Sequence, residues 1–388
     1  MVLFSCAPYA DPMNTRTLVF VGCLNRTVPH FAAANGRGIV TYGFDEATGR
    51  LEFLAETTDI ANPTFLAVVE QRGLLYATSE VFGEPEGAVS AYRVDPMSGA
   101  LLLINRQPTR GSLTAYCDVD RQAGTVFVAN YGHETAAETP RLQIASFSVL
   151  DNGGLSLMSS EFAHTGSGPK MDRQSVPHAH CVVPSPDNRF AVATDLGTDE
   201  LVTYRINVDS RRLESSGVPA TRMNPGAGPR HFVFHPNGVT AYVVNELDST
   251  VCQLAYASGD GTLRLLETVN ALPENPGAGQ PADLQIAADG RFLYASIRGA
   301  DAIGIYRLEE GTGRIVSASV RVAGGKTPRS FALSPAGRFL LVALQDSDRL
   351  AVHRLDPATG EPVEQVGLVA VGTPMCVKAA RLTLLKAR

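Results

Sequence analysis

Residues 228–267 read GPRHFVFHPNGVTAYVVNELDSTVCQLAYASGDGTLRLLE, the clearest copy of a repeated pattern in this chain. It contains a short apolar segment after a Gly-Pro turn, a second apolar segment after an Asn-Gly turn, a loop, and a hairpin. Glycine, asparagine and aspartate tolerate the positive φ that tight strand reversals require. The flanking segments alternate apolar and polar residues and are rich in Val, Phe and Tyr, which predicts β-strands. The stretch therefore reads as one four-stranded unit.

The same unit recurs along the chain. Its neighbours begin QPADLQIAADGRFLYASIRGADAIGIYRL at Gln280 and TPRSFALSPAGRFLLVALQDSDRLAVHRL at Thr327. The outer hairpin occurs seven times, starting at Phe44, Tyr92, Phe147, Tyr204, Tyr256, Tyr306 and His353. Seven four-stranded units of roughly 50 residues predict an all-β fold, a seven-bladed β-propeller that forms a single domain over residues 17–380.

The two ends of the repeat array complement each other. The array begins with a lone second strand, TLVFVGC from Thr17, and ends with a lone first strand, TPMCVKAA from Thr373. Pairing of these strands would complete one blade, close the ring and hide edges that invite aggregation. Residues 1–16 are then expected to be a poorly ordered N-terminal extension.

Composition narrows the function classes. The net charge of −6 argues against a nucleic-acid surface or an anionic-membrane surface. No segment has the run of about 18 apolar residues that spans a bilayer, and the N-terminal segment lacks the basic and apolar regions of a secretion signal. We therefore expect a cytoplasmic location. The six cysteines form no CxxC pair, which favours buried thiols over disulfides or a zinc site.

The repeats differ at the start of the first strand, which lines the channel of a propeller. Alignment on the following turn places one residue per blade at the channel mouth: Thr64, Tyr116, His180, Arg230, Ala282, Arg329 and Met375. Small or apolar side chains would satisfy packing at all seven positions. Two arginines, a histidine and a tyrosine at these positions indicate a binding site instead.

The ends of the second strands supply a further set near the same face. These residues are Glu80, Tyr131, Leu196, Glu246, Arg298 and Gln345. The two sets together predict an anion-binding cup with a carboxylate and a histidine able to move protons. Arginine suits this role because its guanidinium pairs bidentately with carboxylate or phosphate.

Structural roles compete with each functional interpretation. Arg230 could tie neighbouring blades together, and Glu246 could be the counter-ion of an arginine. Alternation along a strand would point His178 and His180 the same way, but no third ligand is evident, so no metal is expected. His231 is expected on the opposite side of its strand, in the core. The insertion GSGPKMDRQSVPH, from Gly166, contains Arg173 and Gln174 and could fold over the cup or remain solvated.

The chain resembles a known family in several motifs. They are NPTFLAV from Asn62, RQSVPHAH from Arg173, GPRHFVFHP from Gly228, VVNEL from Val243 and TPRSFALSPAGRFLLVALQDSD from Thr327. From about Thr17 to Ala380 the chain is similar to the seven-bladed propeller lactonases. This group includes bacterial propeller-type 6-phosphogluconolactonases and fungal carboxy-cis,cis-muconate cyclases. The resemblance implies acid–base chemistry on lactones of acidic small molecules, with no cofactor and no required metal.

The resemblance also assigns residues. Arg230 in GPRH and Glu246 in VVNEL match positions that the family uses, and His180 is a further match. We expect His180, Glu246 and Arg230 to be catalytic, with either Glu246 or His180 as the general base. The expected substrate-binding residues are Arg298, Arg329, Tyr116, Glu80, His178, Arg173 and Gln345.

The expected activity is hydrolysis of the lactone of a small acidic sugar, such as 6-phosphogluconolactone. Two alternatives remain open: a cycloisomerase that interconverts carboxymuconate or muconate and its lactone, and a non-enzymatic binding scaffold. The expected partner is a small anionic lactone or dicarboxylate, with neither nucleic acid nor membrane involved.

Overall fold

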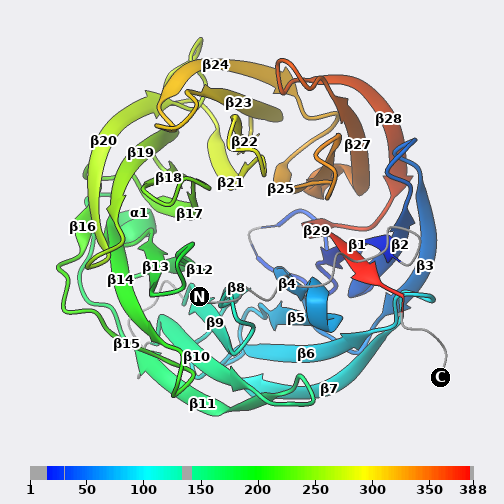
Figure 1. Cartoon of the computed structure of the whole chain (residues 1–388), viewed down its shortest axis with the longest axis horizontal. Coiled ribbons are helices and arrows are strands. Elements are labelled where there is room, and N and C mark those ends of the chain that lie inside the picture. The colour runs from blue at the N-terminus through cyan, green and yellow to red at the C-terminus, as the bar shows by residue number, and fades with distance from the viewer. Residues whose placement is uncertain (1–14, 30, 133–141, 385–388) are drawn as a thin grey trace, which may run out of the picture.

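A computed structural model describes residues 15–29, 31–132 and 142–384. Their strands form seven sheets that stand around a central axis like the blades of a propeller (Figure 1). The prediction of a seven-bladed, all-β ring is confirmed. No helix among these residues is long and apolar enough to cross a bilayer.

In every blade the innermost strand borders the channel and the last strand lies outermost. From inside to outside, the first three blades contain β29 (Pro374–Thr383), β1 (Thr15–Cys23), β2 (Ile39–Phe44) and β3 (Leu51–Thr57); β4 (Leu66–Val69), β5 (Leu74–Ser79), β6 (Ala88–Val94) and β7 (Leu101–Pro108); and β8 (Thr114–Val119), β9 (Thr125–Asn130), β10 (Ile144–Val149) and β11 (Leu155–Phe162).

The other four blades continue this order. They contain β12 (Ala179–Pro184), β13 (Phe190–Asp195), β14 (Glu200–Asn207) and β15 (Arg212–Ser215), with the short β16 (Thr221–Arg222) also on β14; β17 (Pro229–Phe234), β18 (Thr240–Asn245), β19 (Thr250–Ala257) and β20 (Thr262–Asn270); β21 (Gln280–Ile286), β22 (Phe292–Arg298), β23 (Ala302–Leu308) and β24 (Ile315–Val322); and β25 (Pro328–Leu333), β26 (Phe339–Leu344), β27 (Arg349–Leu355) and β28 (Pro362–Ala370). The helical turns are η2 (Glu70–Arg72), α1 (Met171–Gln174) and η3 (Gln345–Ser347).

Burial explains the different character of inner and outer strands. The second strands β5, β9, β13, β18 and β26 are buried over their whole length, because both of their faces pack against neighbouring blades. Their sequences are accordingly almost continuously apolar. The outer strands β20 and β28 expose most of their residues and carry charged side chains. The core therefore lies between the blades, and the channel side is left for function.

The predicted closure of the ring is confirmed. Strand β1 pairs antiparallel with β29 from Thr15 opposite Thr383 to Cys23 opposite Pro374, and the two strands lie side by side in Figure 1. The paired region is longer than expected at one end, where β1 begins at Thr15 and β29 continues to Thr383. Of the predicted extension, residues 1–14 lie outside the described part of the chain, and residues 15 and 16 belong to the ring.

The chain reaches the channel mouth in a repeated conformation. In four blades a residue with positive φ precedes a proline and then the mouth residue: Asn62, Gly228, Thr327 and Thr373 have φ of 41°, 65°, 56° and 37°. In several blades the ladder then skips one residue, which stands opposite no partner. Such bulges re-aim a side chain at the rim of a sheet. The skipped residues are His180, Arg230, Arg329 and Met375.

Candidate functional site

A cavity of about 900 Å³ lies where these bulged residues meet the ends of the second strands. Six of the predicted site residues line it: Glu80, Arg173, His180, Glu246, Arg298 and Arg329. A smaller cavity shares Glu80, His180 and Arg329 with the first and also reaches Arg230. Residues separated by up to about 250 positions are thus brought to one mouth of the channel, as the repeat alignment predicted.

Glu246 holds three arginines together. Its Oε1 lies 2.7 Å from Arg173 Nη2, and its Oε2 lies 3.0 Å from Arg230 Nε and 2.8 Å from Arg298 Nη2. Only 5% of the Glu246 side chain is exposed, and only 3% of the Arg230 side chain. A buried charge is tolerated only when it is paired and hydrogen-bonded in this way.

The three arginines also control the ionisation of Glu246. Burial by itself raises the pKa of this carboxyl, but Arg298, Arg230 and Arg173 outweigh burial and hold the pKa well below its usual range. Glu246 therefore stays ionised and takes up a proton with difficulty. Its geometry suits a counter-ion that fixes guanidinium groups better than it suits a general base.

Arg329 stands apart from this cluster. Its guanidinium lies 4.9 Å from the centre of the Phe31 ring, a distance typical of a cation–π contact. Among the described residues it has neither a hydrogen bond nor an ion pair, although Glu80 lies near enough to favour its charge. Arg329 is thus an arginine of this cavity that has no ion pair among the described residues and whose donors remain available to a ligand.

His180 faces the same cavity as a neutral imidazole. Burial, and next the charge of Arg230, hold the pKa of His180 well below its usual value. The ring packs edge-on against Tyr131 and His231. Its Nδ1 is buried and has no hydrogen-bond partner within the described ranges. A neutral imidazole that lines a cavity and keeps one nitrogen without a partner is a candidate proton acceptor, although Nδ1 itself is enclosed.

The insertion that carries Arg173 is anchored to the ring. Gln174 is fully buried, and its Nε2 donates to the Leu196 carbonyl at 2.8 Å and to Asp199 Oδ1 at 2.7 Å. The Lys170 N–H donates to Gln174 Oε1 at 3.1 Å. These bonds fix α1, so that Arg173 reaches Glu246 from above the blades. Of the two interpretations of this insertion, the structure shows the one in which it folds over the cup.

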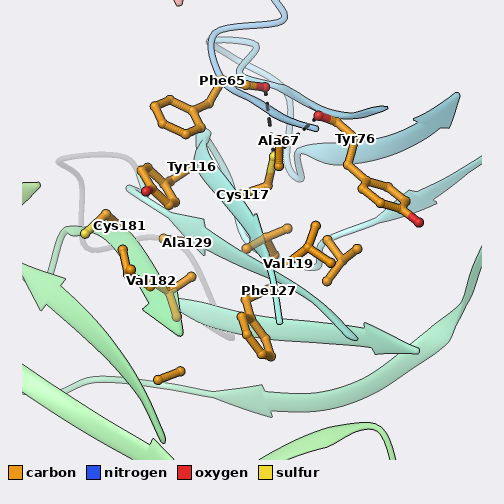
Figure 2. Close-up of a cluster of buried hydrophobic side chains, with 14 of the residues drawn as sticks. Phe65, Ala67, Tyr76, Tyr116, Cys117, Val119, Phe127, Ala129, Cys181 and Val182 are labelled. Atoms are coloured by element: carbon orange, nitrogen blue, oxygen red, sulfur yellow. Dashed lines mark hydrogen bonds between the residues drawn. The ribbon is translucent and has the colours of Figure 1, made fainter. Parts of the chain in front are cut away.

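The predicted position of Tyr116 at the mouth is wrong by one residue. In this blade the ladder skips Ala115, and Ala115 lines the smaller cavity at the position equivalent to Arg230. Tyr116 stacks on Phe65 with ring centres 4.0 Å apart, within a cluster of buried hydrophobic side chains (Figure 2). The repeat alignment could not detect this shift, because a bulge changes the facing of side chains without changing the residue types around it.

Two other predicted ligands do not line the cavity. His178 stacks on Tyr131, and its Nδ1 lies 2.8 Å from the Tyr131 carbonyl oxygen. Gln345 is buried in η3, where its Nε2 donates to Asp346 Oδ1 at 2.9 Å. Among the described residues no group of three His, Cys, Asp or Glu side chains could hold a metal ion.

His231 is buried, as expected, but its side chain does not point away from Arg230. Its Nε2 lies 3.1 Å from Arg230 Nη1, so the two consecutive side chains meet instead of pointing apart. The bulge at Arg230 is the reason. Phe31, which supports Arg329, was not identified from the sequence, since it lies in a loop outside the repeat pattern. Tyr131, which contacts Arg173, was marked only by its place at the end of a second strand.

Comparison with known proteins identifies the family of the chain. Residues 19–379 match the family model described as "Lactonase, 7-bladed beta-propeller". A 6-phosphogluconolactonase of Bacillus subtilis is 32% identical over 300 residues, which cover 77% of this chain and 82% of the relative. A 6-phosphogluconolactonase of Formosa agariphila is 32% identical over 314 residues, covering 80% and 84% of the two chains.

A solved structure gives the same result. The periplasmic gluconolactonase of Pseudomonas aeruginosa superimposes with a TM-score of 0.83 at 30% identity, over 94% of this chain and 99% of that one. The match to the family model, over residues 19–379, runs through all seven blades and includes part of each strand that closes the ring. The chain therefore belongs to the seven-bladed β-propeller lactonase family.

Proposed function

We propose that this protein hydrolyses the lactone of a small organic anion. The observation that carries the proposal is the juxtaposition of two groups in one cavity: Arg329, whose donors are unpaired within the described residues, and His180, whose Nδ1 lacks a partner there. The first can bind an anionic group, and the second can accept a proton. The named relatives, 6-phosphogluconolactonases and a gluconolactonase, support lactone hydrolysis as the reaction.

An arginine without an acidic partner favours an anionic substrate. Four guanidinium groups and four carboxylates line the two cavities, and Arg329 has no ion pair with a described residue. Three of the four arginines are already bound to Glu246. A phosphate or carboxylate on the substrate would pair with Arg329 through a bidentate contact.

The chemical step follows from the same groups. His180 removes a proton from water, and the resulting hydroxide attacks the lactone carbonyl carbon. An arginine on Glu246 stabilises the oxyanion, a contribution of about 3 kcal/mol in other enzymes. The intermediate collapses with cleavage of the ring C–O bond, and the proton on His180 passes to the departing alkoxide. The product is the open hydroxy acid.

Substrate binding would also strengthen the base. Arg230 and Arg329 both lower the pKa of His180. An anion placed among these arginines offsets their field, so the pKa of His180 rises when substrate is present. The histidine is then a stronger base in the complex than in the free protein.

We propose that the reaction needs no metal. The arginines can supply the electrostatic stabilisation that a metal ion would provide. Activity that survives dialysis against EDTA supports this part of the proposal. Activity that is lost and then restored by a divalent metal contradicts it.

A substrate panel tests the proposed function. The purified chain is incubated with 6-phosphogluconolactone, glucono-δ-lactone, muconolactone and carboxymuconate, and acid release or ring closure is followed above the spontaneous rate. Faster hydrolysis of the phosphorylated than of the neutral sugar lactone is the expected result. Reaction with carboxymuconate alone would identify a cycloisomerase. A protein that transforms none of these compounds and binds no phosphate is a scaffold.

A further inference from the structure

A buried polar chain leads away from the cavity behind Arg230. Arg230 Nη1 lies 3.1 Å from His231 Nε2, and His231 Nδ1 lies 2.9 Å from Asp283 Oδ1. Arg230, His231 and Asp283 are each at most 5% exposed. The proposed mechanism uses neither the histidine nor this aspartate.

The hydrogen-bond chemistry fixes the proton on His231. A guanidinium can only donate hydrogen bonds, so His231 Nε2 must be the acceptor. Nδ1 then carries the proton and donates a hydrogen bond to the carboxylate of Asp283. His231 is therefore neutral, in agreement with burial and the neighbouring Arg230, which lower its pKa to about 4.

Asp283 is itself held rigidly from two blades. Its Oδ1 accepts the Leu284 N–H at 2.9 Å, and its Oδ2 accepts the Ser330 hydroxyl at 2.9 Å and the Phe331 N–H at 3.2 Å. The carboxylate therefore has a fixed orientation and imposes that orientation on the imidazole. Further groups around His231 are the rings of Phe65, Tyr116 and His180 and the charge of Lys378.

The hydrogen bonds of this buried polar chain determine which nitrogen of Arg230 is left for a ligand. Nε donates to Glu246 Oε2 at 3.0 Å, and Nη1 donates to the Ala282 carbonyl at 2.5 Å and to His231. Nη2 is the guanidinium nitrogen of Arg230 that has no hydrogen bond to the described residues. Arg230 borders the smaller cavity, which it shares with His180 and Arg329.

We propose that His231 and Asp283 are a positioning pair: Asp283 fixes His231 as a neutral acceptor for Arg230 Nη1, and this contact orients Nη2 toward the bound substrate. The inference rests on the proposed function for its kinetic consequence, but its structural part does not depend on any activity. A histidine that served only as core packing would need neither this tautomer nor a hydrogen bond to Arg230.

The tautomer can be measured in the full chain without any substrate. Histidine nitrogens are labelled with ¹⁵N, and the His231 signals are assigned by their disappearance in His231→Phe. At pH 7 we expect a protonated Nδ1 and an unprotonated Nε2, and we expect this tautomer preference to be lost in Asp283→Asn. A charged His231 ring, or a proton on Nε2, would overturn the proposal.

Kinetics on the best lactone substrate test the consequence. Loss of a hydrogen bond to a charged group corresponds to about a ten-fold effect, so His231→Phe should raise KM about ten-fold with little change in kcat. His231→Gln should restore KM to within about three-fold of wild type, because its amide oxygen can accept from Arg230 and its amide nitrogen can donate to Asp283. His353→Leu removes a buried imidazole outside the cavity lining and should leave KM unchanged.

Thermal unfolding of each variant separates a folding defect from a positioning effect. If the Phe variant keeps the wild-type KM, or the Gln variant is equally impaired at full stability, the pair does not position Arg230. If the wild-type protein hydrolyses no lactone, the proposed function fails. The tautomer, and the binding of inorganic phosphate to the same variants by calorimetry, then decide the positioning role alone.

Discussion

Replacing Arg329 should have a different effect from replacing an arginine that is bound to Glu246. Because Arg329 has no acidic partner among the described residues, its replacement should cost binding more than folding. Arg329→Gln should raise KM about ten-fold or more and change kcat less, since a charged contact to the substrate anion is lost. Arg291→Gln, which removes an exposed arginine paired with Asp289, is the control for general charge loss. Equal kinetic effects of the two substitutions would refute the assignment.

His180 should affect the chemical step. His180→Gln retains most of the volume and polarity of the side chain but removes the basic nitrogen. General-base catalysis contributes about 10²- to 10⁴-fold, so we expect kcat to fall by at least about 10²-fold with a small change in KM. Steady-state rates on the preferred lactone provide the measurement. A variant with near-normal kcat would exclude His180 as the base.

Glu246 should affect stability first. Glu246→Gln would leave three clustered guanidinium groups without their common counter-ion. Breaking a buried ion pair from one side costs about 3 to 5 kcal/mol, so the free energy of unfolding should fall by roughly that amount. Glu309→Gln, which disrupts an exposed pair with Arg314, should leave the free energy of unfolding nearly unchanged, because exposed ion pairs contribute little. Chemical denaturation of both variants distinguishes these outcomes.

At the residue scale, the sequence predicts which side chains share the mouth better than it predicts how they pair. His180, Glu246 and Arg329 were placed correctly, because each occupies a fixed position in a repeat. The one-residue error at Tyr116 and the facing of His231 arise from bulges, which depend on strand pairing between blades. The shared partner of the three arginines could not be derived either, since ion pairing depends on side-chain reach in three dimensions.

At the scale of elements, a repeated hydrogen-bonded contact, which we call the bracket, joins three blades to the start of the next one. In these blades the residue just before the third strand is an aspartate with positive φ (Asp199, Asp301 or Asp348), and its carboxylate accepts backbone N–H groups of the following blade. Asp301 Oδ1 accepts the Thr327 N–H at 2.7 Å, two residues before Arg329. Asp199 accepts the N–H groups of Gly226 and Gly228 in the same way.

The bracket at Asp301 should influence both folding and binding. Asp301→Ala leaves the Thr327 N–H without this acceptor and should lower the free energy of unfolding by about 1 to 2 kcal/mol. Because Thr327 sets the path of the chain to Arg329, we also expect KM to rise a few-fold. Asp289→Ala, in the same blade, removes an aspartate that bonds only to Arg291. If KM changes equally in both variants, the bracket does not position Arg329.

Elements with local signals were predictable and those held by distant contacts were not. The hairpins follow from Asp, Asn and Gly in tight turns, so their number and order could be read directly. The short helix α1 has no periodicity to reveal it. Its position depends on Gln174 contacting Leu196 and Asp199, which are more than 20 residues away.

For the whole molecule, the buried histidines predict how stability depends on pH. Burial lowers the pKa of His180, His231 and His353 in the folded state. The unfolded chain therefore binds protons below about pH 6.5 that the folded chain excludes, and stability falls as the pH decreases through this range. With a folded pKa of about 4, His231 alone should account for roughly 1 to 2 kcal/mol between pH 6.5 and 5.

Denaturation curves at several pH values test this dependence. The free energy of unfolding should be highest above pH 6.5 and should decline toward pH 5, and His231→Gln should show a shallower decline. A stability that is constant from pH 7 to pH 5 would contradict the prediction.

The closure of the ring was predictable at this scale as well. The repeat array has an incomplete blade at each end, and each incomplete blade has only one possible complement.

The closing blade has a consequence for the time course of biosynthesis. Val21 pairs with Val377, which the ribosome adds 356 residues later. At about 5 to 20 residues per second, roughly 20 to 70 s pass before the inner neighbour of β1 is available. During that interval the nascent chain exposes an apolar, hydrogen-bonding strand edge. The emerging polypeptide should therefore depend on chaperone protection until β29 has left the exit tunnel, even though six blades are already complete.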